Sequence, residues 1–516
     1  MIEQKSSFVT DFLQRRAQLT PDRLAVRDTI AGRDITYAAW NAQANQTANF
    51  LRSLGVSEGD RVAVLATNSM AYMDVWMACG KIGAILQNLN WRLAPAELEG
   101  LIHDAGPRVL IYSDEFIDVV NALRPAIPGV RHFVAMNQPA VPAAPADPPF
   151  AERDAHPTEL AAPRPDLEWD APWVICYTGG TTGLPKGAIL SHGNMTWNSI
   201  NTVMSWGLDQ NDVSILTSPL FHTGGLNVFT LPLIHCGGAS ILCRGFDPDQ
   251  VFDLIEGGDV TLFFGVPTMF VVLQGHPRWP QADFSRLKLV ISGGAPCPMP
   301  VFERFWAKGV DFKTGYGLTE AGPNTFWLPG PDVRRKPGAV GFPLMHVDVC
   351  AVRPDGSVCA AGEPGELLIR GPHVTPGYWN NPAATAQAIV DGWLHTGDLA
   401  VCDDEGYYTI VGRLKDMIIS GGENVYPAEV ESVMYRHPAI KEAALIGVPD
   451  DKWGEVGRAV VVVEPGKALD ETSLIAFLRE QLARYKVPKS VVFVDALPKT
   501  GAGKIDKKAL VEQYGN

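Results

Sequence analysis

Hydrophobic and polar positions in the first 135 residues follow two alternating patterns. Residues 61–65 and 109–112 are short, mostly apolar runs of the kind that form buried strands. Between them, residues 71–80 follow a helical pattern. Strands and helices that alternate in this way predict βαβ units around a mainly parallel sheet. We therefore predict an α/β fold, with a large N-terminal domain of mainly parallel sheets and flanking helices.

A second, smaller unit follows residues 412–415. Pro427 stands where a helix would begin, and Glu429 and Glu431 lie near the positive end of that helix. Further elements are expected as strands at residues 417–420, 444–448 and 459–463, and as an amphipathic helix at residues 472–483. About 100 residues are enough for a separate α+β domain. We predict domains at residues 1–412 and 416–516, joined by residues 413–415.

Residues 139–165 contain eight prolines and many alanines. Such a stretch can mark a domain boundary or a surface excursion within one large domain. A strand at residues 173–176 and a glycine-rich loop come next, and this continuation favours the excursion.

Composition excludes several classes of protein. Hydrophobic residues make up 46% of the 516 residues and charged residues 19%, which is ordinary for a globular chain. The net charge of −14 argues against nucleic acid as the main partner. No apolar run approaches the roughly 20 residues of a membrane span, and the first residues lack a signal-peptide pattern, so we expect a cytoplasmic protein. None of the eight cysteines forms a C-x-x-C pair, which favours reduced, buried thiols over a zinc site.

The strongest chemical signal is a loop rich in glycine, threonine and lysine. It reads Tyr177-Thr178-Gly179-Gly180-Thr181-Thr182-Gly183-Leu184-Pro185-Lys186-Gly187. Its glycines expose backbone N–H groups, and its hydroxyls and ammonium can bind polyphosphate. It is not a Walker A loop, because Pro185 precedes the lysine and no serine or threonine follows it.

This loop resembles the signature of the adenylate-forming (ANL) superfamily, which includes the acyl-CoA synthetases. Four further motifs occur in the order that the family has: Gly315-Tyr316-Gly317-Leu318-Thr319-Glu320, Trp393-Leu394-His395-Thr396-Gly397-Asp398, Gly412-Arg413-Leu414-Lys415-Asp416 with Gly421-Gly422-Glu423-Asn424, and Pro498-Lys499-Thr500-Gly501-Ala502-Gly503-Lys504-Ile505. Together the five motifs extend the resemblance over essentially the whole chain.

The resemblance implies a reaction in which a carboxylate attacks the α-phosphate of ATP. Two anions then meet, so positioning and cationic stabilisation are needed. The expected ATP ligands are Thr178, Gly179, Gly180, Thr181, Thr182, Gly183 and Lys186 for phosphate, Gly293, Gly294, Ala295, Tyr316 and Gly317 around adenine, and Asp398 and Arg413 at the ribose. Glu320 offers a hard oxygen ligand for Mg²⁺, and Thr319 can donate to the α-phosphate.

Lys504 is the expected catalytic residue of this first half-reaction. A cation about 4 Å from an anion contributes about 4 kcal/mol before desolvation at an effective dielectric near 20. By the resemblance, the small domain then turns at a hinge at Lys415 and withdraws Lys504. The same movement brings in Gly421, Gly422 and Glu423, which line the tunnel for the pantetheine thiol of CoA.

His222 in Phe221-His222-Thr223-Gly224-Gly225 matches the family motif beside the acyl pocket, and we expect it near the substrate carboxylate. No acidic residue occupies positions 219–227, so a buried substrate ammonium would lack a partner. This argues against an α-amino acid as substrate.

The sequence therefore predicts an ATP-dependent carboxylic acid–CoA ligase that forms acyl-AMP and then acyl-CoA. A fatty or related monocarboxylic acid is the favoured substrate, and an aromatic acid of the hydroxycinnamate or benzoate type is the alternative. Expected pocket segments are residues 227–229, 266–269, 317 and 323–324, which mix apolar and polar residues. A non-catalytic adenylate-binding protein is the hypothesis from another class, and the presence of Lys186, Glu320 and Lys504 argues against it. A homodimer is expected from relatives.

Overall fold

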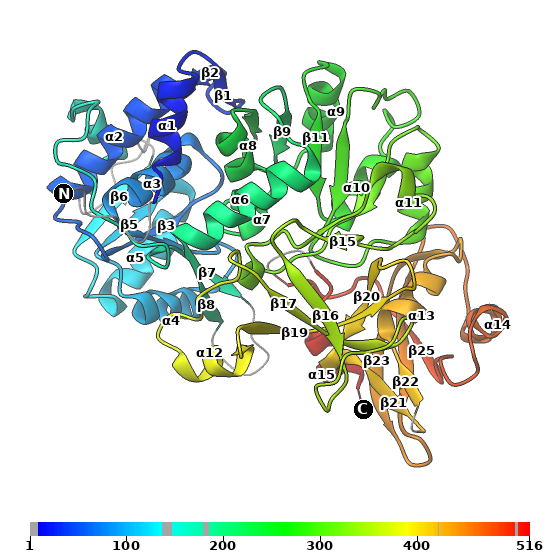
Figure 1. The fold of residues 1–516 in the computed structure, drawn as a ribbon. Helices are drawn as coiled ribbons and strands as arrows, with labels where there is room; N and C mark the ends of the chain where they lie inside the picture. The colour runs from blue at the N-terminus through cyan, green and yellow to red at the C-terminus, as the bar shows by residue number, and fades with distance from the viewer. Residues whose placement is uncertain (1–8, 137–146, 179–184, 422, 501–503, 516) are drawn as a thin grey trace.

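Two mainly parallel sheets form the large N-terminal part of the protein (Figure 1). The computed structural model describes residues 9–136, 147–178, 185–421, 423–500 and 504–515. In the first sheet the strands run in the order β6 (His132–Ala135), β5 (Val109–Tyr112), β3 (Arg61–Leu65), β4 (Ile85–Asn88), β7 (Pro172–Thr178) and β8 (Lys186–Ser191). All neighbours are parallel except the β7–β8 hairpin.

The second sheet lies beside the first and is also parallel except at one edge. Its order is β13 (Phe312–Thr314), β12 (Leu289–Ser292), β11 (Leu262–Gly265), β9 (Val213–Leu216), β10 (Ala239–Leu242), β1 (Leu24–Asp28) and β2 (Arg33–Thr36). Only β1 and β2 pair antiparallel. Strands such as β12 are buried along their whole length, as expected for parallel sheets covered on both faces.

Helices cover these sheets. They are α1 (Phe12–Leu19), α2 (Tyr37–Ser53), α3 (Met70–Ile82), α4 (Pro95–Ala105), α5 (Ile117–Leu123), α6 (His192–Trp206), α7 (Thr223–Asn227), α8 (Thr230–Cys236), α9 (Pro248–Glu256), α10 (Pro267–Gly275) and α11 (Met299–Trp306). Helix α3 is buried on all sides, and the side chain of Ser69 caps its first turn by accepting from the N–H of Tyr72. Trp40 of α2 and Trp76 of α3 are fully buried and contribute large apolar surfaces to this core.

Strands β6 and β7, on either side of the proline-rich segment, belong to the same sheet. The segment therefore connects two strands of one domain, as predicted, and does not mark a domain boundary. Its described part, from residue 147 onward, packs on α2. Asn49 donates to the carbonyls of Pro157 and Glu159 at 2.9 and 2.7 Å. Arg153 forms a buried ion pair with Asp74 of α3. These bonds attach the excursion to the surface of the domain.

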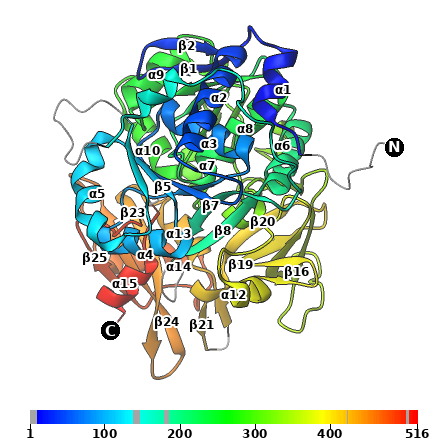
Figure 2. The same cartoon turned by 90° about the vertical axis from the view of Figure 1, so that its left-hand side faces the viewer.

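Antiparallel sheets form the last third of the chain (Figures 1 and 2). One contains β16 (Asp348–Val352), β17 (Pro364–Arg370), β19 (Trp393–Cys402), β18 (Ile389–Val390) and β20 (Tyr408–Arg413), near the pair β14 (Phe326–Trp327) and β15 (Phe342–Pro343) and the helix α12 (Pro382–Ala388). The other contains β22 (Glu423–Val425), β21 (Ile418–Ser420), β24 (Gly454–Val463), β23 (Ile440–Asp450) and β25 (Ser490–Phe493), with α13 (Pro427–Met434), α14 (Glu471–Gln481) and α15 (Lys507–Tyr514). Only β25 pairs parallel, with β24.

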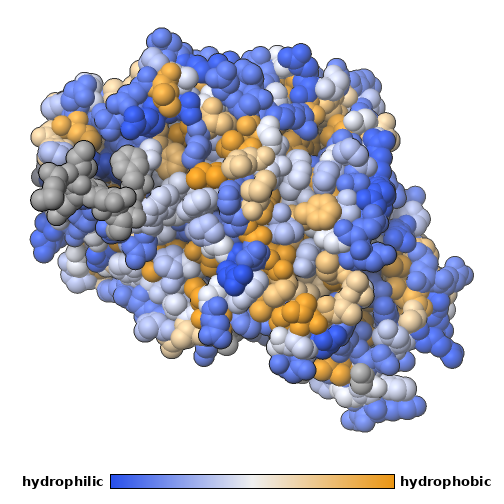
Figure 3. Space-filling view, viewed as in Figure 1, coloured by the Kyte–Doolittle hydropathy of each residue, from blue (hydrophilic) through white to orange (hydrophobic). Residues whose placement is uncertain are grey.

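The predicted fold class is confirmed. Strands β3 and β5 have the predicted bounds, and Pro427 is the first residue of α13. The eight cysteines are free thiols, of which Cys79, Cys176 and Cys243 are buried, whereas the other five keep partial exposure. Among the described residues, no helix is both long and apolar enough to cross a membrane. On the face shown in Figure 3, apolar side chains are interspersed with hydrophilic ones, as on most folded proteins.

Candidate active site

The hairpin of β7 and β8 carries the two described ends of the glycine- and threonine-rich motif. Thr178 ends β7 and lies opposite Lys186, the first residue of β8, in the antiparallel register. The other predicted phosphate ligands lie outside the described residues: Gly179, Gly180, Thr181, Thr182 and Gly183. The structure thus places Thr178 and Lys186 opposite each other where the predicted loop begins and ends.

Glu320 lies in the short 3₁₀ helix η4 (Thr319–Ala321), and only 9% of its surface is exposed. Two hydroxyls donate to its Oε1 atom, that of Tyr378 at 2.9 Å and that of Thr178 at 3.3 Å. Its Oε2 atom has no hydrogen bond within the described part of the chain. Mg²⁺ prefers carboxylate oxygens together with substrate phosphates. A carboxylate that accepts hydrogen bonds at Oε1 and keeps Oε2 available for a cation fits the predicted metal ligand.

Tyr378 is a site residue that the sequence did not reveal. It lies in the loop between β17 and α12, 58 residues from Glu320. The ammonium of Lys186 lies 5.2 Å from the centre of its ring. Burial, together with the charge of Glu320, raises the pKa of Tyr378, so its hydroxyl remains a proton donor at neutral pH. An aromatic residue after Gly377 is a signal too weak to have found it.

Thr319 begins η4 and hydrogen-bonds through its side chain to Cys176 of β7. Burial raises the pKa of the Cys176 thiol to about 12, so this thiol stays neutral. The predicted α-phosphate donor is therefore next to the β7–β8 hairpin.

Asp398 in β19 connects the predicted adenine and ribose ligands. Its Oδ2 atom accepts from the hydroxyl of Tyr316 at 2.6 Å, and its Oδ1 atom lies 3.0 Å from Nε of Arg413. The Asp398 side chain is 8% exposed, whereas that of Arg413 is 53% exposed. Burial and the charge of Asp398 raise the pKa of Tyr316 well above its ordinary value. The structure brings these three predicted residues together.

Glycines follow strands β12 and β13. The N–H of Gly293 donates to the carbonyl of Gly265 at 3.1 Å. A Cβ atom on Gly317 would lie 1.9 Å from the carbonyl oxygen of Pro323, so no larger residue fits there. A Cβ on Gly294, which has a φ of +80°, would lie 3.7 Å from Cε of Lys504. Lys504, which the sequence places in another motif, therefore reaches the glycine loop at residues 293–295.

Lys504 lies among charged groups of the N-terminal part. Burial of the ammonium lowers the pKa of Lys504, as does nearby Arg413, while Asp398 and Glu320 act in the opposite direction. The residue as a whole is exposed, while its ammonium lies near these charged groups. The N–H of Thr500 donates to the carbonyl of Lys504 at 2.7 Å, so the two described ends of this motif meet. The structure therefore unites Lys504 with the ribose and metal ligands predicted from the sequence.

His222 precedes α7 and is half-buried, with its ring turned inward. Its Nε2 atom has no hydrogen-bond partner in the described part of the chain. Burial lowers the pKa of His222 to about 4, with smaller effects of Lys504 and Arg92, so the imidazole is neutral at pH 7. Asn68 orients this loop, because its Oδ1 accepts from the N–H of Leu220 at 2.9 Å and its amide donates to Ser218. The sequence did not point to Asn68, which is 152 residues from Leu220.

The remaining predicted residues, those of the hinge and the CoA loop, lie in two different places. Lys415 lies in the turn after β20, where burial lowers its pKa and Asp398 is among the charges that affect it. Gly421 donates its N–H to the carbonyl of Trp453 at 2.8 Å, and exposed Glu423 begins β22. Gly422 lies outside the described residues. Figures 1 and 2 place β21 at the end of the C-terminal part remote from β7 and β8. The described residues of the predicted CoA loop are thus apart from the predicted phosphate ligands Thr178 and Lys186 in this structure.

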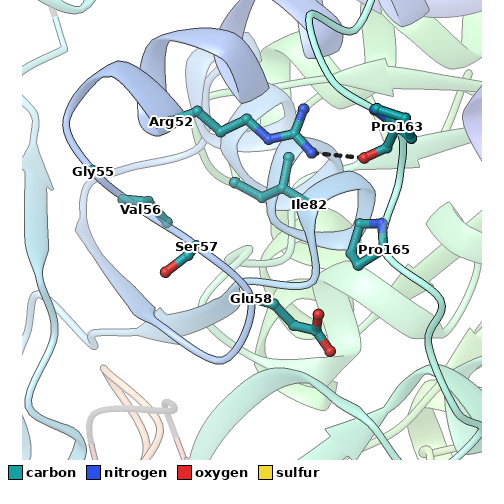
Figure 4. Close-up of a pocket in the computed structure, with 8 residues that line it drawn as sticks. All are labelled: Arg52, Gly55, Val56, Ser57, Glu58, Ile82, Pro163 and Pro165. Atoms are coloured by element: carbon teal, nitrogen blue, oxygen red, sulfur yellow. Dashed lines mark hydrogen bonds between the residues drawn. The ribbon is translucent and has the colours of Figure 1, made fainter.

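A surface hollow of about 390 Å³ lies elsewhere, where the proline-rich segment crosses the end of α2 (Figure 4). Arg52 there donates to the carbonyls of Ala162 and Pro163 at 2.9 and 3.1 Å. Its guanidinium therefore already serves to attach the segment. The chemistry predicted for this protein converges instead around Glu320, Asp398 and Lys504.

Two family models match most of the chain. The family model described as AMP-binding enzyme matches residues 13–379, and that described as AMP-binding enzyme C-terminal domain matches residues 429–504. The chain is 43% identical to a feruloyl-CoA synthase of Amycolatopsis sp., covering 97% of this chain and 98% of that protein. It is 38% identical to an indoleacetate–CoA ligase of Aromatoleum aromaticum (97% and 96% covered) and 36% identical to the long-chain-fatty-acid–CoA ligase FadD13 of Mycobacterium tuberculosis (97% and 97%).

Solved structures show the same fold. ATP-bound MatB from Rhodopseudomonas palustris superposes with a TM-score of 0.89 at 34% identity, covering 98% of this chain and 99% of that chain. The anthranilate–CoA ligase AuaEII in complex with anthranoyl-AMP has a TM-score of 0.90 at 28% identity, with 98% and 96% covered. The chain belongs to the AMP-binding enzyme family, within the adenylate-forming superfamily. It is an AMP-forming acid–CoA ligase, as predicted.

Proposed function

We propose that this enzyme activates an aromatic carboxylic acid of the arylpropenoic type and transfers the acyl group to CoA. The observation that carries this choice is the 43% identity, over 97% of the chain, to an enzyme named for feruloyl-CoA synthesis. The fatty-acid alternative, which the sequence favoured, has support from the 36% identical FadD13.

Buried hydrogen bonds fix two of the expected segments of the acyl pocket, residues 227–229 and 323–324. The amide of Asn198 in α6 donates to the carbonyl of Asn227 at 2.8 Å. The amide of Asn324 donates to Thr202 at 2.8 Å and to the carbonyl of Val228 at 3.1 Å. These groups are buried, and any substrate that separated them would leave polar atoms unpaired, so the pocket wall formed by these segments is expected to be rigid.

In the first half-reaction, an oxygen of the substrate carboxylate attacks the α-phosphorus of ATP, and pyrophosphate leaves. Lys504 is proposed to stabilise the negative charge that develops, and Thr319 to donate to an α-phosphate oxygen. Thr178, Lys186 and the loop between them would bind the β- and γ-phosphates. Glu320 would hold Mg²⁺, which neutralises phosphate charge when bound. Asp398 and Arg413 would bind the ribose, and Tyr316 with the glycine loop at residues 293–295 the adenine.

In the second half-reaction, the thiolate of CoA attacks the acyl carbonyl, and AMP leaves. We propose that residues 416–516 turn as a unit about Lys415 for this step, relative to residues 1–412. Such a turn would withdraw Lys504 and bring Gly421, Gly422 and Glu423 toward the acyl group. The separation of β21 from the β7–β8 hairpin, together with the approach of Lys504 to the loop at residues 293–295, supports this division. Neutral His222 would border the acyl carboxylate.

The test is a comparison of ferulate, 4-coumarate, cinnamate, benzoate, indoleacetate, decanoate and palmitate, each with ATP, Mg²⁺ and CoA. Pyrophosphate release and thioester formation are measured in parallel. We expect kcat/KM for a hydroxycinnamate to exceed that for decanoate by about tenfold or more, equivalent to about 1.4 kcal/mol. A preference for decanoate or palmitate would reject the aromatic proposal in favour of a fatty acid. Pyrophosphate without thioester would show that CoA is not the acceptor.

A further inference from the structure

Tyr378 has no assigned part in the reaction described above, although its hydroxyl contacts the carboxylate of Glu320. Its backbone belongs to a short stretch that pairs with β8. The N–H of Ile189 donates to the carbonyl of Gly377 at 3.0 Å, and the N–H of Trp379 donates to the carbonyl of Gly187 at 2.7 Å. Tyr378 itself lies opposite Ala188 in an antiparallel bridge. Backbone pairing with β8, the strand that begins with Lys186, thus fixes the position of Tyr378.

The loop that carries Tyr378 is also attached to the backbone of η4. The N–H of Thr375 donates to the carbonyl of Glu320 at 2.8 Å, and the Thr375 hydroxyl donates to the carbonyl of Ile189 at 2.6 Å. Strand β8, this loop and η4 are therefore connected by backbone hydrogen bonds. A donor held in this way can orient a carboxylate without the entropy cost of ordering a free side chain.

The two hydroxyls on Glu320 are not equivalent. Thr178 lies 3.3 Å from Oε1 of Glu320 and 3.4 Å from the carbonyl of Lys186, and its single proton can serve only one of these acceptors at a time. Tyr378 is closer, at 2.9 Å, and donates only to Glu320 among the described residues. A hydroxyl that donates to an ionised carboxylate makes a stronger bond than one that donates to a neutral acceptor.

We propose that Tyr378 is a positioning residue, whose hydroxyl holds Oε1 of Glu320 so that Oε2 remains available to the Mg²⁺ of Mg·ATP. This inference rests on the proposed role of Glu320 and extends it. Tyr378 touches neither nucleotide nor metal in this assignment and acts through the carboxylate. A purely structural role would instead require only that the hydroxyl stabilise its own loop.

The experiment measures ATP binding by calorimetry, without carboxylic acid or CoA, in Mg²⁺ and in EDTA. Tyr378→Phe removes the hydroxyl and keeps the ring that faces Lys186. We expect affinity in EDTA to stay within twofold of the parent protein, while affinity in Mg²⁺ falls about tenfold, in the range for a hydrogen bond to a charged group. The Mg²⁺ concentration for half-maximal ATP binding should rise by a similar factor.

Two further variants test whether the effect of Tyr378→Phe acts through Glu320. Tyr407→Phe is the matched control, because the Tyr407 hydroxyl also donates to a carboxylate, that of Asp332, at 2.6 Å but outside the site. It should leave ATP binding unchanged under both conditions. In a Glu320→Gln background, Tyr378→Phe should cause no further loss of the Mg²⁺-dependent affinity, since the two residues act through one contact.

Equal losses in Mg²⁺ and EDTA, no loss in Mg²⁺, or full additivity with Glu320→Gln would each overturn the proposal. If Glu320→Gln alone retains the Mg²⁺ effect, the role given to Glu320 fails as well. The choice of acyl substrate is not touched by any of these outcomes, because no acid is present. Should Tyr378→Phe not fold, 3-fluorotyrosine at position 378 gives a second measurement. Its ¹⁹F resonance should move when Mg²⁺ is added to the ATP complex, and an unchanged resonance would refute the proposal.

Discussion

Replacement of His373 by leucine should change how the stability of this protein depends on pH. His373 lies in the segment that connects β17 with the Tyr378 loop, and its exposed surface is 0%. Neither ring nitrogen has a hydrogen-bond partner among the described residues. Burial alone lowers the pKa of His373 from 6.5 to about 4. Leucine has a similar volume and cannot be protonated.

The sign and size of the effect follow from these two pKa values. Because the pKa is lower in the folded state, the unfolded chain binds more protons between pH 6.5 and pH 4. The stability that depends on neutral His373 is fully present above pH 6.5 and is lost as the pH falls toward 4. At pH 5 the loss amounts to about 2 kcal/mol, whereas at pH 7.5 it is close to zero.

The assay is chemical denaturation at pH 7.5 and pH 5.0, followed by tryptophan fluorescence. When the pH is lowered from 7.5 to 5.0, the difference in the free energy of unfolding between His373→Leu and the parent should shift by about 2 kcal/mol in favour of the variant. His103→Leu is the control, since the His103 side chain is 55% exposed, and it should follow the parent. Burial also lowers the pKa of His192 to about 3 and of His235 to about 4, so the variant remains acid-sensitive. Parallel losses in His373→Leu and the parent would refute the reasoning.

Two further predictions concern the site itself. Lys504→Ala should reduce acyl-adenylate formation, measured as pyrophosphate release, by roughly two to four orders of magnitude, while CoA thioester formation from supplied acyl-AMP stays nearly unchanged. An equal fall in both steps would contradict the proposed domain movement. Gly317→Ala should abolish adenylation and lower stability by about 2 kcal/mol or more, because its Cβ would lie 1.9 Å from a backbone oxygen of Pro323. Gly275→Ala, where a Cβ would meet nothing within 4 Å, is the control, and similar losses in both variants would exclude this steric cause.

Local patterns predicted much of the framework. Residues 61–65 and 109–112 form β3 and β5 with the predicted bounds, because short apolar runs become buried strands in any parallel sheet. Pro427 begins α13, since proline fits the first position of a helix. Thr178 lies in a loop whose glycines and hydroxyls indicate phosphate binding, whereas Glu320 and Asp398 were selected through the resemblance to a family. Hydrophobic periodicity and turn chemistry involve residues only a few positions apart. The sequence alone therefore predicts local elements and short motifs.

Contacts between distant segments depended on the tertiary structure. The sequence did not indicate that Tyr378 would donate to Glu320, or that Asn68 would hold the backbone before His222, because 58 and 152 residues separate these partners. Lys504 was expected at the site through resemblance to a family, and its contact with the Gly294 loop is visible only once the C-terminal sheet is placed. Each of these interactions needs two sheets or loops to meet at one orientation, which the packing of the whole core determines and no local pattern encodes.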